Sequence, residues 1–234
     1  MATRGAFVAM VLSAVVLVAA GCETTTAGTA KPVKRGPLTP STSAGPGPNG
    51  PLKQYLLSAD DVNEIMGATD IEVVNSSDEL SDNSSDISDV SCLGTLYNAE
   101  EEVYKGSGWT DVADEILTEP EDDSDHWVEQ TIVRFPSEDK ALAFYNRTIE
   151  DWTNCIGKEV SIDDGEYEYG WRFEGINIVG KSITQTARQT DSDGWACDHT
   201  LVAKGVHIVE ASACGNSLST ESADLAGKIA DGIT

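Results

Sequence analysis

The longest apolar run of the chain lies near its beginning, from Ala6 to Ala20, and Ser13 is its single polar member. Its 15 residues fall short of the roughly 20 that a membrane-spanning helix needs. Arg4 precedes the run, and small residues lead from it into Cys22. A charged start, an apolar middle and a small-residue cleavage site are typical of a signal peptide. We therefore predict that residues 1–21 are a signal peptide.

The four residues Ala19-Ala20-Gly21-Cys22 resemble a lipobox, the recognition site of lipoprotein signal peptidase. Ala19 stands where leucine is commoner, and an ordinary secretory signal with an incidental cysteine is the alternative. We expect lipidation of Cys22, because two or three acyl chains hold a protein on a membrane effectively permanently. The predicted location is the outer face of the cytoplasmic membrane, with the membrane as partner through this lipid anchor.

Large apolar side chains are nearly absent between Glu23 and Gly50, where threonine, glycine and proline are frequent. Such a segment cannot bury enough surface to offset its ordering entropy. Residues 22–50 are therefore predicted to be a lipid-anchored flexible tether. The remaining residues, 51–234, are enough for one domain with a hydrophobic core.

Three helices are indicated by apolar positions at helical spacing inside this domain. The first begins at the N-cap Ser58 and ends at Gly67. The second follows Ser137 and carries an apolar stripe that runs to Cys155. The third begins at Ser219 or Thr220 and places five apolar residues on one side, namely Leu225, Ala226, Ile229, Ala230 and Ile233.

Strands are indicated where apolar and polar residues alternate or β-branched residues cluster. Trp127 to Phe135 alternates, and Tyr167 to Thr190 is long enough for two strands. Trp195 to Ala203 and Val206 to Ala213 flank Lys204-Gly205, which is a hairpin signal. Helices at both ends of a run of strands predict an α+β fold, with an antiparallel sheet and the helices packed on one face.

The domain is strongly acidic. Residues 51–234 hold 11 of the 15 Lys and Arg and 39 of the 40 Asp and Glu, which gives a formal charge of −28. Such a surface repels phosphate backbones, so nucleic acid is excluded as a partner. Residues 68–125 contain 18 acids and one lysine, and we expect the middle of this segment, Ser76 to Ser91, to be a mobile loop.

With Cys22 assigned to lipid, the four cysteines Cys92, Cys155, Cys197 and Cys214 remain. An even number in an exported chain indicates two disulfides, for which three pairings exist. If Cys197 faces Cys214 in the hairpin, the two-residue loop is Gly205-Val206, and glycine in its first position suits a type II′ turn. The local pattern therefore favours this bridge, and Cys92 pairs with Cys155 by elimination.

No motif of the chain indicates catalysis or a bound cofactor. Gly175 to Ser182 fits the P-loop pattern, but its β-branched residues favour a strand where the P-loop needs a helix start. The acidic runs Glu121 to Asp125 and Asp191 to Gly194 do not match the EF-hand spacing for calcium, and solvated loops are the preferred interpretation. The three histidines form no recognisable zinc or nucleophile arrangement. We predict no catalytic residues, no metal and no cofactor.

Three residues stand out as candidates for ligand binding. Trp109 and Trp171 lie beside glycines, which favours an open pocket near them over burial in the core. Arg134 is a scarce cation in an acidic domain, and an anionic or polar ligand would need such a partner.

The chain resembles the PknH-like extracellular sensor domains of mycobacterial serine/threonine kinases and of the lipoproteins that share them. Three stretches carry the resemblance: Leu56-Leu57-Ser58 through Gly67, Trp152 to Cys155, and Gly194-Trp195-Ala196-Cys197 with Cys214. It covers roughly residues 52–233, with departures at Lys204-Gly205 and in the acidic segment. The resemblance implies sequential disulfides and an α+β fold with an open cleft that binds an unidentified extracellular ligand.

The leading hypothesis is a non-enzymatic envelope lipoprotein whose cleft binds a small molecule or an envelope component and signals through a partner protein. One alternative is a structural lipoprotein that docks another envelope protein. A hydrolase of cell-wall material is the other alternative.

Overall fold

The computed structural model of the chain describes residues 51–120, 124–165 and 167–233. The predicted signal peptide, Cys22 and the tether lie outside these residues. Within the described ranges, no helix combines the length and the apolar character that crossing a bilayer requires.

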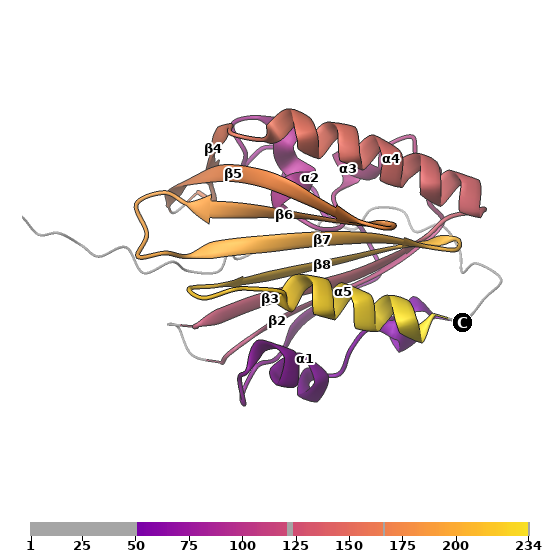
Figure 1. Cartoon of the computed structure of the whole chain (residues 1–234), viewed down its shortest axis with the longest axis horizontal. Coiled ribbons are helices and arrows are strands. Elements are labelled where there is room, and N and C mark those ends of the chain that lie inside the picture. The colour runs from indigo at the N-terminus through magenta and orange to yellow at the C-terminus, as the bar shows by residue number, and fades with distance from the viewer. Residues whose placement is uncertain (1–50, 121–123, 166, 234) are drawn as a thin grey trace, which may run out of the picture.

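One antiparallel sheet of eight strands organises the described residues (Figure 1), in the order β1-β2-β3-β8-β7-β6-β5-β4. The strands are β1 (Glu72–Ser77), β2 (Asp111–Thr118), β3 (His126–Arg134), β4 (Glu159–Asp163), β5 (Glu168–Val179), β6 (Ser182–Gln189), β7 (Ala196–Lys204) and β8 (His207–Gly215). The helices are α1 (Ala59–Met66), α2 (Leu93–Leu96), α3 (Glu101–Tyr104), α4 (Glu138–Cys155) and α5 (Glu221–Gly232), with 3₁₀ turns η1 (Leu52–Tyr55) and η2 (Val90–Cys92). The α+β class and the antiparallel sheet are confirmed.

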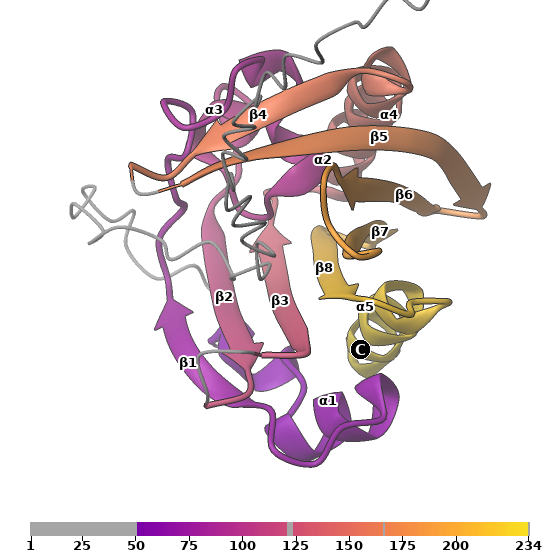
Figure 2. The same ribbon diagram turned by 90° about the vertical axis from the view of Figure 1, so that its left-hand side faces the viewer.

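Both faces of the sheet carry helices, which corrects the expectation of a single covered face. Two neighbouring residues of β7 show this directly. The His199 ring lies 4.7 Å from the Trp152 ring of α4, whereas the Thr200 hydroxyl is 2.8 Å from Ser222 of α5. Figure 2 shows α1 and α5 together on one side of the sheet and α2, α3 and α4 on the other. Successive strand residues point to opposite faces, so a central strand buried along its whole length needs cover on both sides.

The predicted helix boundaries are confirmed by their caps. Ser58 accepts a hydrogen bond from the Asp61 N–H at 3.3 Å, and Gly67 ends α1 with φ 69°. Ser137 accepts from the Lys140 N–H at 3.4 Å, where α4 begins. Thr220 precedes α5. The Ser58 and Ser137 hydroxyls satisfy N–H groups that have no partner inside the helix, whereas the Thr220 side chain makes no such bond.

The predicted hairpin and both disulfides are also confirmed. Cys197 lies opposite Cys214, and the loop between β7 and β8 is Gly205-Val206, with φ 57° at Gly205. The Cα atoms of this bridged pair are 4.0 Å apart, and those of Cys92 and Cys155 are 5.7 Å apart.

The acidic segment is more regular than expected. It contains β1, η2, α2, α3 and β2, and Leu80 and Ile87 are buried in the stretch predicted to be mobile. A few apolar residues spaced between acids are enough to fix this stretch on the sheet. The Gly175 to Ser182 motif forms the end of β5, the turn Gly180-Lys181 and the first residue of β6, with no helix start as a P-loop would have.

Candidate functional site

The three ligand-binding candidates from the sequence lie in three different places. Trp109 is partly exposed between α3 and β2 and packs on the core beneath α4. Arg134 is buried on β3, where its guanidinium donates to Asp111 at 2.7 Å. Trp171 is buried on β5 in the core that contains both disulfides. The structure does not bring them together, and their role in binding stays a prediction, as does the open cleft.

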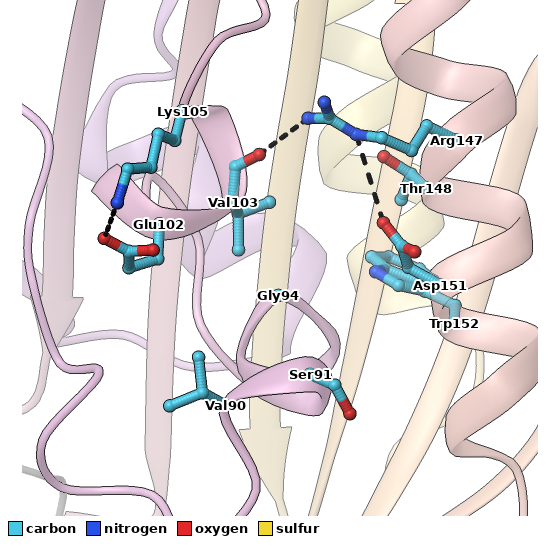
Figure 3. Close-up of a pocket in the computed structure, with 10 residues that line it drawn as sticks. All are labelled: Val90, Ser91, Gly94, Glu102, Val103, Lys105, Arg147, Thr148, Asp151 and Trp152. Atoms are coloured by element: carbon cyan, nitrogen blue, oxygen red, sulfur yellow. Dashed lines mark hydrogen bonds and ion pairs between the residues drawn. The ribbon is translucent and has the colours of Figure 1, made fainter.

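A pocket of about 260 Å³ lies instead between α4 and the segment that holds α2 and α3 (Figure 3). None of the three candidates lines it. Its walls come from η2 and α2 (Val90, Ser91, Gly94), from α3 and its C-cap residue (Glu102, Val103, Lys105) and from α4 (Arg147, Thr148, Asp151, Trp152).

Covalent and polar contacts hold the two walls together on either side of the pocket. The Cys92–Cys155 disulfide joins the start of α2 to the last residue of α4. Arg147 of α4 donates to the Val103 carbonyl of α3 at 2.7 Å. Because the walls are tied in this way, the space between them exists before any ligand arrives, which reduces the entropy lost on binding.

The wall residue Gly94 leaves room for α3 to approach. A Cβ atom at this position would lie 2.9 Å from Cγ2 of Val103, which is too close for two carbon atoms. Any side chain there would push Val103 away or narrow the pocket.

Two ion pairs make the pocket mouth polar. Lys105 contacts Glu102 at 2.7 Å, and the Arg147 Nε lies 4.0 Å from Asp151. Burial raises the pKa of Asp151, while the charge of Arg147 opposes that rise. The pocket therefore offers two cations and two carboxylates in a domain whose other charges are mostly negative.

Beneath the pocket a buried polar chain links both walls to the sheet. The Tyr104 hydroxyl of α3 donates to Glu210 Oε1 at 2.6 Å, and His199 Nε2 lies 3.1 Å from Glu210 Oε2. The ring of His199 in turn contacts Trp152 of α4. Burial, together with the charge of Glu210, raises the pKa of Tyr104 well above its usual value, so this hydroxyl stays a donor.

The arrangement can bind a small molecule through hydrogen bonds, charge and contact with apolar side chains, the usual combination in ligand pockets. Within residues 51–120, 124–165 and 167–233, no three His, Cys, Asp or Glu side chains gather as a metal site would require. The acidic residues 121–123 lie outside that description.

Sequence reasoning missed these residues because the pocket arises where α3 meets α4, far apart along the chain. One signal was available. Arg147 is as scarce a cation as Arg134, and it lies off the apolar stripe of its helix, where it can reach a second element.

A family model, curated relatives and a solved structure all match this chain, and all three point to the extracellular domain of PknH. The family model described as PknH-like extracellular domain matches residues 48–232. The serine/threonine-protein kinases PknH of Mycobacterium bovis and of Mycobacterium tuberculosis are 31% identical over 182 residues, which are 78% of this chain. The chain spans only about 30% of the length of these curated relatives. The crystal structure of the extracellular domain of PknH from Mycobacterium tuberculosis matches with a TM-score of 0.73 and 30% identity, over 76% of this chain and 92% of that one.

Proposed function

Because the chain belongs to the family of PknH-like extracellular domains, a sensor-type domain of a kinase, we propose that it is a non-enzymatic sensor lipoprotein that binds a small ligand in the pocket between α3 and α4. The similarity concerns the extracellular domain and not the catalytic part of the kinase. A signal from this protein would therefore pass through a partner in the envelope.

The observation that carries the proposal is the tied pocket itself. A disulfide and the Arg147 hydrogen bond tie two chain segments together around about 260 Å³ of space. Val90 and Val103 offer apolar contact to a ligand, and Asp151 and Lys105 offer opposite charges. A small polar molecule from the envelope fits this lining better than a lipid chain would.

The proposed location rests on the N-terminal sequence. An apolar run that ends in Ala19-Ala20-Gly21-Cys22 supports export and lipidation, and two structural disulfides suit an oxidising compartment. We propose that the acyl chains on Cys22 keep the domain at the outer face of the cytoplasmic membrane.

Ligand binding is tested by filling the pocket from its mouth. Val90 is 45% exposed, so Val90→Trp adds bulk there without disturbing the core. Val74→Trp is the matched control, because Val74 is 51% exposed on β1 and does not line the pocket.

The measurement is the melting temperature of each protein with fractions of envelope lipids, glycans, small metabolites and metal ions. A ligand stabilises the folded state by about 2.7 kcal/mol at a hundred times its Kd. We expect one fraction to stabilise the wild type and Val74→Trp, and to leave Val90→Trp unchanged. Equal stabilisation of all three proteins would place the ligand elsewhere.

A further inference from the structure

Strand β5 has an open outer edge along half its length. It runs for 12 residues, but β4 pairs only with its first five, Glu168 to Arg172. Figure 2 shows β5 extending beyond β4. Phe173 still bonds outward, because its N–H donates to the Lys158 carbonyl at 3.0 Å and its C=O accepts from the Gly157 N–H at 2.9 Å. Among the described residues, no other strand pairs with the outer side of positions 174–179.

The backbone of this edge presents free hydrogen-bonding positions. Val179 pairs with Ser182 around the two-residue loop Gly180-Lys181. The closing pair of such a hairpin exchanges its hydrogen bonds, and the pattern then alternates along the strand. Asn177 therefore bonds toward β6, whereas the N–H and C=O groups of Ile176 and Ile178 point outward.

The last side chains along this edge are apolar and exposed, and acids are absent there, whereas the rest of the domain is strongly acidic. Ile178 is 46% exposed and Val179 is 69% exposed. Residues 175–190 contain no acid, and their only charges are Lys181 and Arg188. Proteins normally protect an open edge with charges, proline or a covering segment. Among the residues that the structure describes, the one such protective feature is the register shift between Phe173 and Ile176, which lies before the apolar stretch.

We propose that β5 pairs with β5 of a second copy of the chain, antiparallel and around a two-fold axis that passes beside Asn177. In this register Ile176 of each copy lies opposite Ile178 of the other. Both residues direct their backbone groups outward, so these pairs can form hydrogen bonds. The two sheets then join into one.

The charges at the two ends of the segment favour the same partner. Glu174 precedes the apolar stretch and Lys181 follows it. Antiparallel pairing brings Glu174 of one copy next to Lys181 of the other at both ends of the contact. Elsewhere two domains of formal charge −28 repel each other, so an acid-free edge is where a second copy can approach.

The ion pairs that these residues make within one copy do not oppose the contact. Glu174 binds Arg188 at 2.7 Å, and Lys181 binds Glu138 at 3.1 Å. All four side chains are about half exposed. Exposed pairs of this kind contribute little, about 0–1 kcal/mol, so their exchange costs little.

The register of the proposed β5–β5 pairing is tested by Asn177→Cys in the full chain, expressed in the bacterium that makes the protein. Directly opposite residues in a pair without hydrogen bonds have Cα atoms about 4.5 Å apart, close enough for a disulfide. We expect a reducible band of twice the chain mass on a non-reducing gel. Val74→Cys is the matched control, because it exposes a thiol on the other edge strand, and it should remain single.

Three outcomes would overturn the proposal: no dimer with Asn177→Cys, equal cross-linking of both variants, or a cross-link to a different protein. A second measurement needs no added cysteine. Sedimentation of the wild type should show a monomer–dimer equilibrium, and Ile178→Lys should weaken the association constant about tenfold or more, equivalent to about 1.4 kcal/mol. A wild type that stays monomeric at all concentrations contradicts the contact.

Discussion

At the scale of single residues, two buried tyrosine hydroxyls differ in whether they have a hydrogen-bond partner. Tyr104 donates to the buried carboxylate of Glu210, whereas the hydroxyl of Tyr145 has no hydrogen-bond partner among the described residues. Tyr104→Phe leaves part of a buried carboxylate unsatisfied, and we expect it to lower the free energy of unfolding by about 1.5–3 kcal/mol. Tyr145→Phe removes an unpaired polar atom and should be neutral or stabilising. Urea unfolding of both variants checks the pair, and equal losses would contradict the network.

Asp151 predicts how the pocket responds to pH. Burial raises the pKa of this carboxyl in the folded protein, so folding favours its protonated form. The resulting stabilisation is complete below the unfolded pKa and is lost as pH rises through the folded pKa. Asp151→Asn removes the penalty of the charged form, so we expect a variant at least as stable as wild type at neutral pH. The advantage should disappear below about pH 3.5. A variant that is less stable at neutral pH would show that the pair with Arg147 outweighs burial.

The residues of the candidate site could be predicted only in part from the types of single residues. Trp109, Arg134 and Trp171 were selected by residue type and by neighbouring glycines. Trp171 illustrates the difficulty, because its glycine neighbour Gly170 marks a close approach of Thr190 to the backbone. A glycine thus indicates tight packing as readily as open space, and one sequence does not distinguish the two.

At the scale of elements, the two disulfides should differ in what they support. On the chain-entropy model the Cys92–Cys155 bridge contributes about 4 kcal/mol and the Cys197–Cys214 bridge about 3 kcal/mol. Only the first joins the walls of the pocket. We expect Cys92→Ala with Cys155→Ala to abolish stabilisation by ligand, and Cys197→Ala with Cys214→Ala to retain it. Denaturant unfolding and ligand-dependent melting check both, and retained binding in the first variant would contradict the proposed site.

Helices were easier to predict than strands for a physical reason. Caps such as Ser58, Gly67 and Ser137 act locally and are visible in the sequence. Strands β2 and β4 were missed because acids occupy several of their positions, and β1 because it is short and mostly exposed. The pairing of β1 with β2 also depends on a partner far along the chain. The local sequence also does not show whether helices cover one face of the sheet or both. It depends on the packing of α4 and α5 against opposite sides of β7.

At the scale of the whole molecule, the proposed sensor role requires that the protein be held at the membrane. Acyl chains on Cys22 would anchor a domain with a strongly acidic surface to the membrane. We expect Cys22→Ser to release the protein from the detergent-rich phase into the aqueous phase, while Thr25→Ser stays with the membrane. Phase separation of cell extracts followed by immunoblotting measures this. Retention of Cys22→Ser in the detergent phase would show that something other than the lipid anchors the chain.

Native mass spectrometry of protein released gently from the envelope of the bacterium that makes it shows whether the pocket between α3 and α4 holds a small ligand. We expect an added mass on the wild type and on Val74→Trp that disappears on denaturation and is absent from Val90→Trp. A wild type without any added mass, or the same added mass on Val90→Trp, would contradict it.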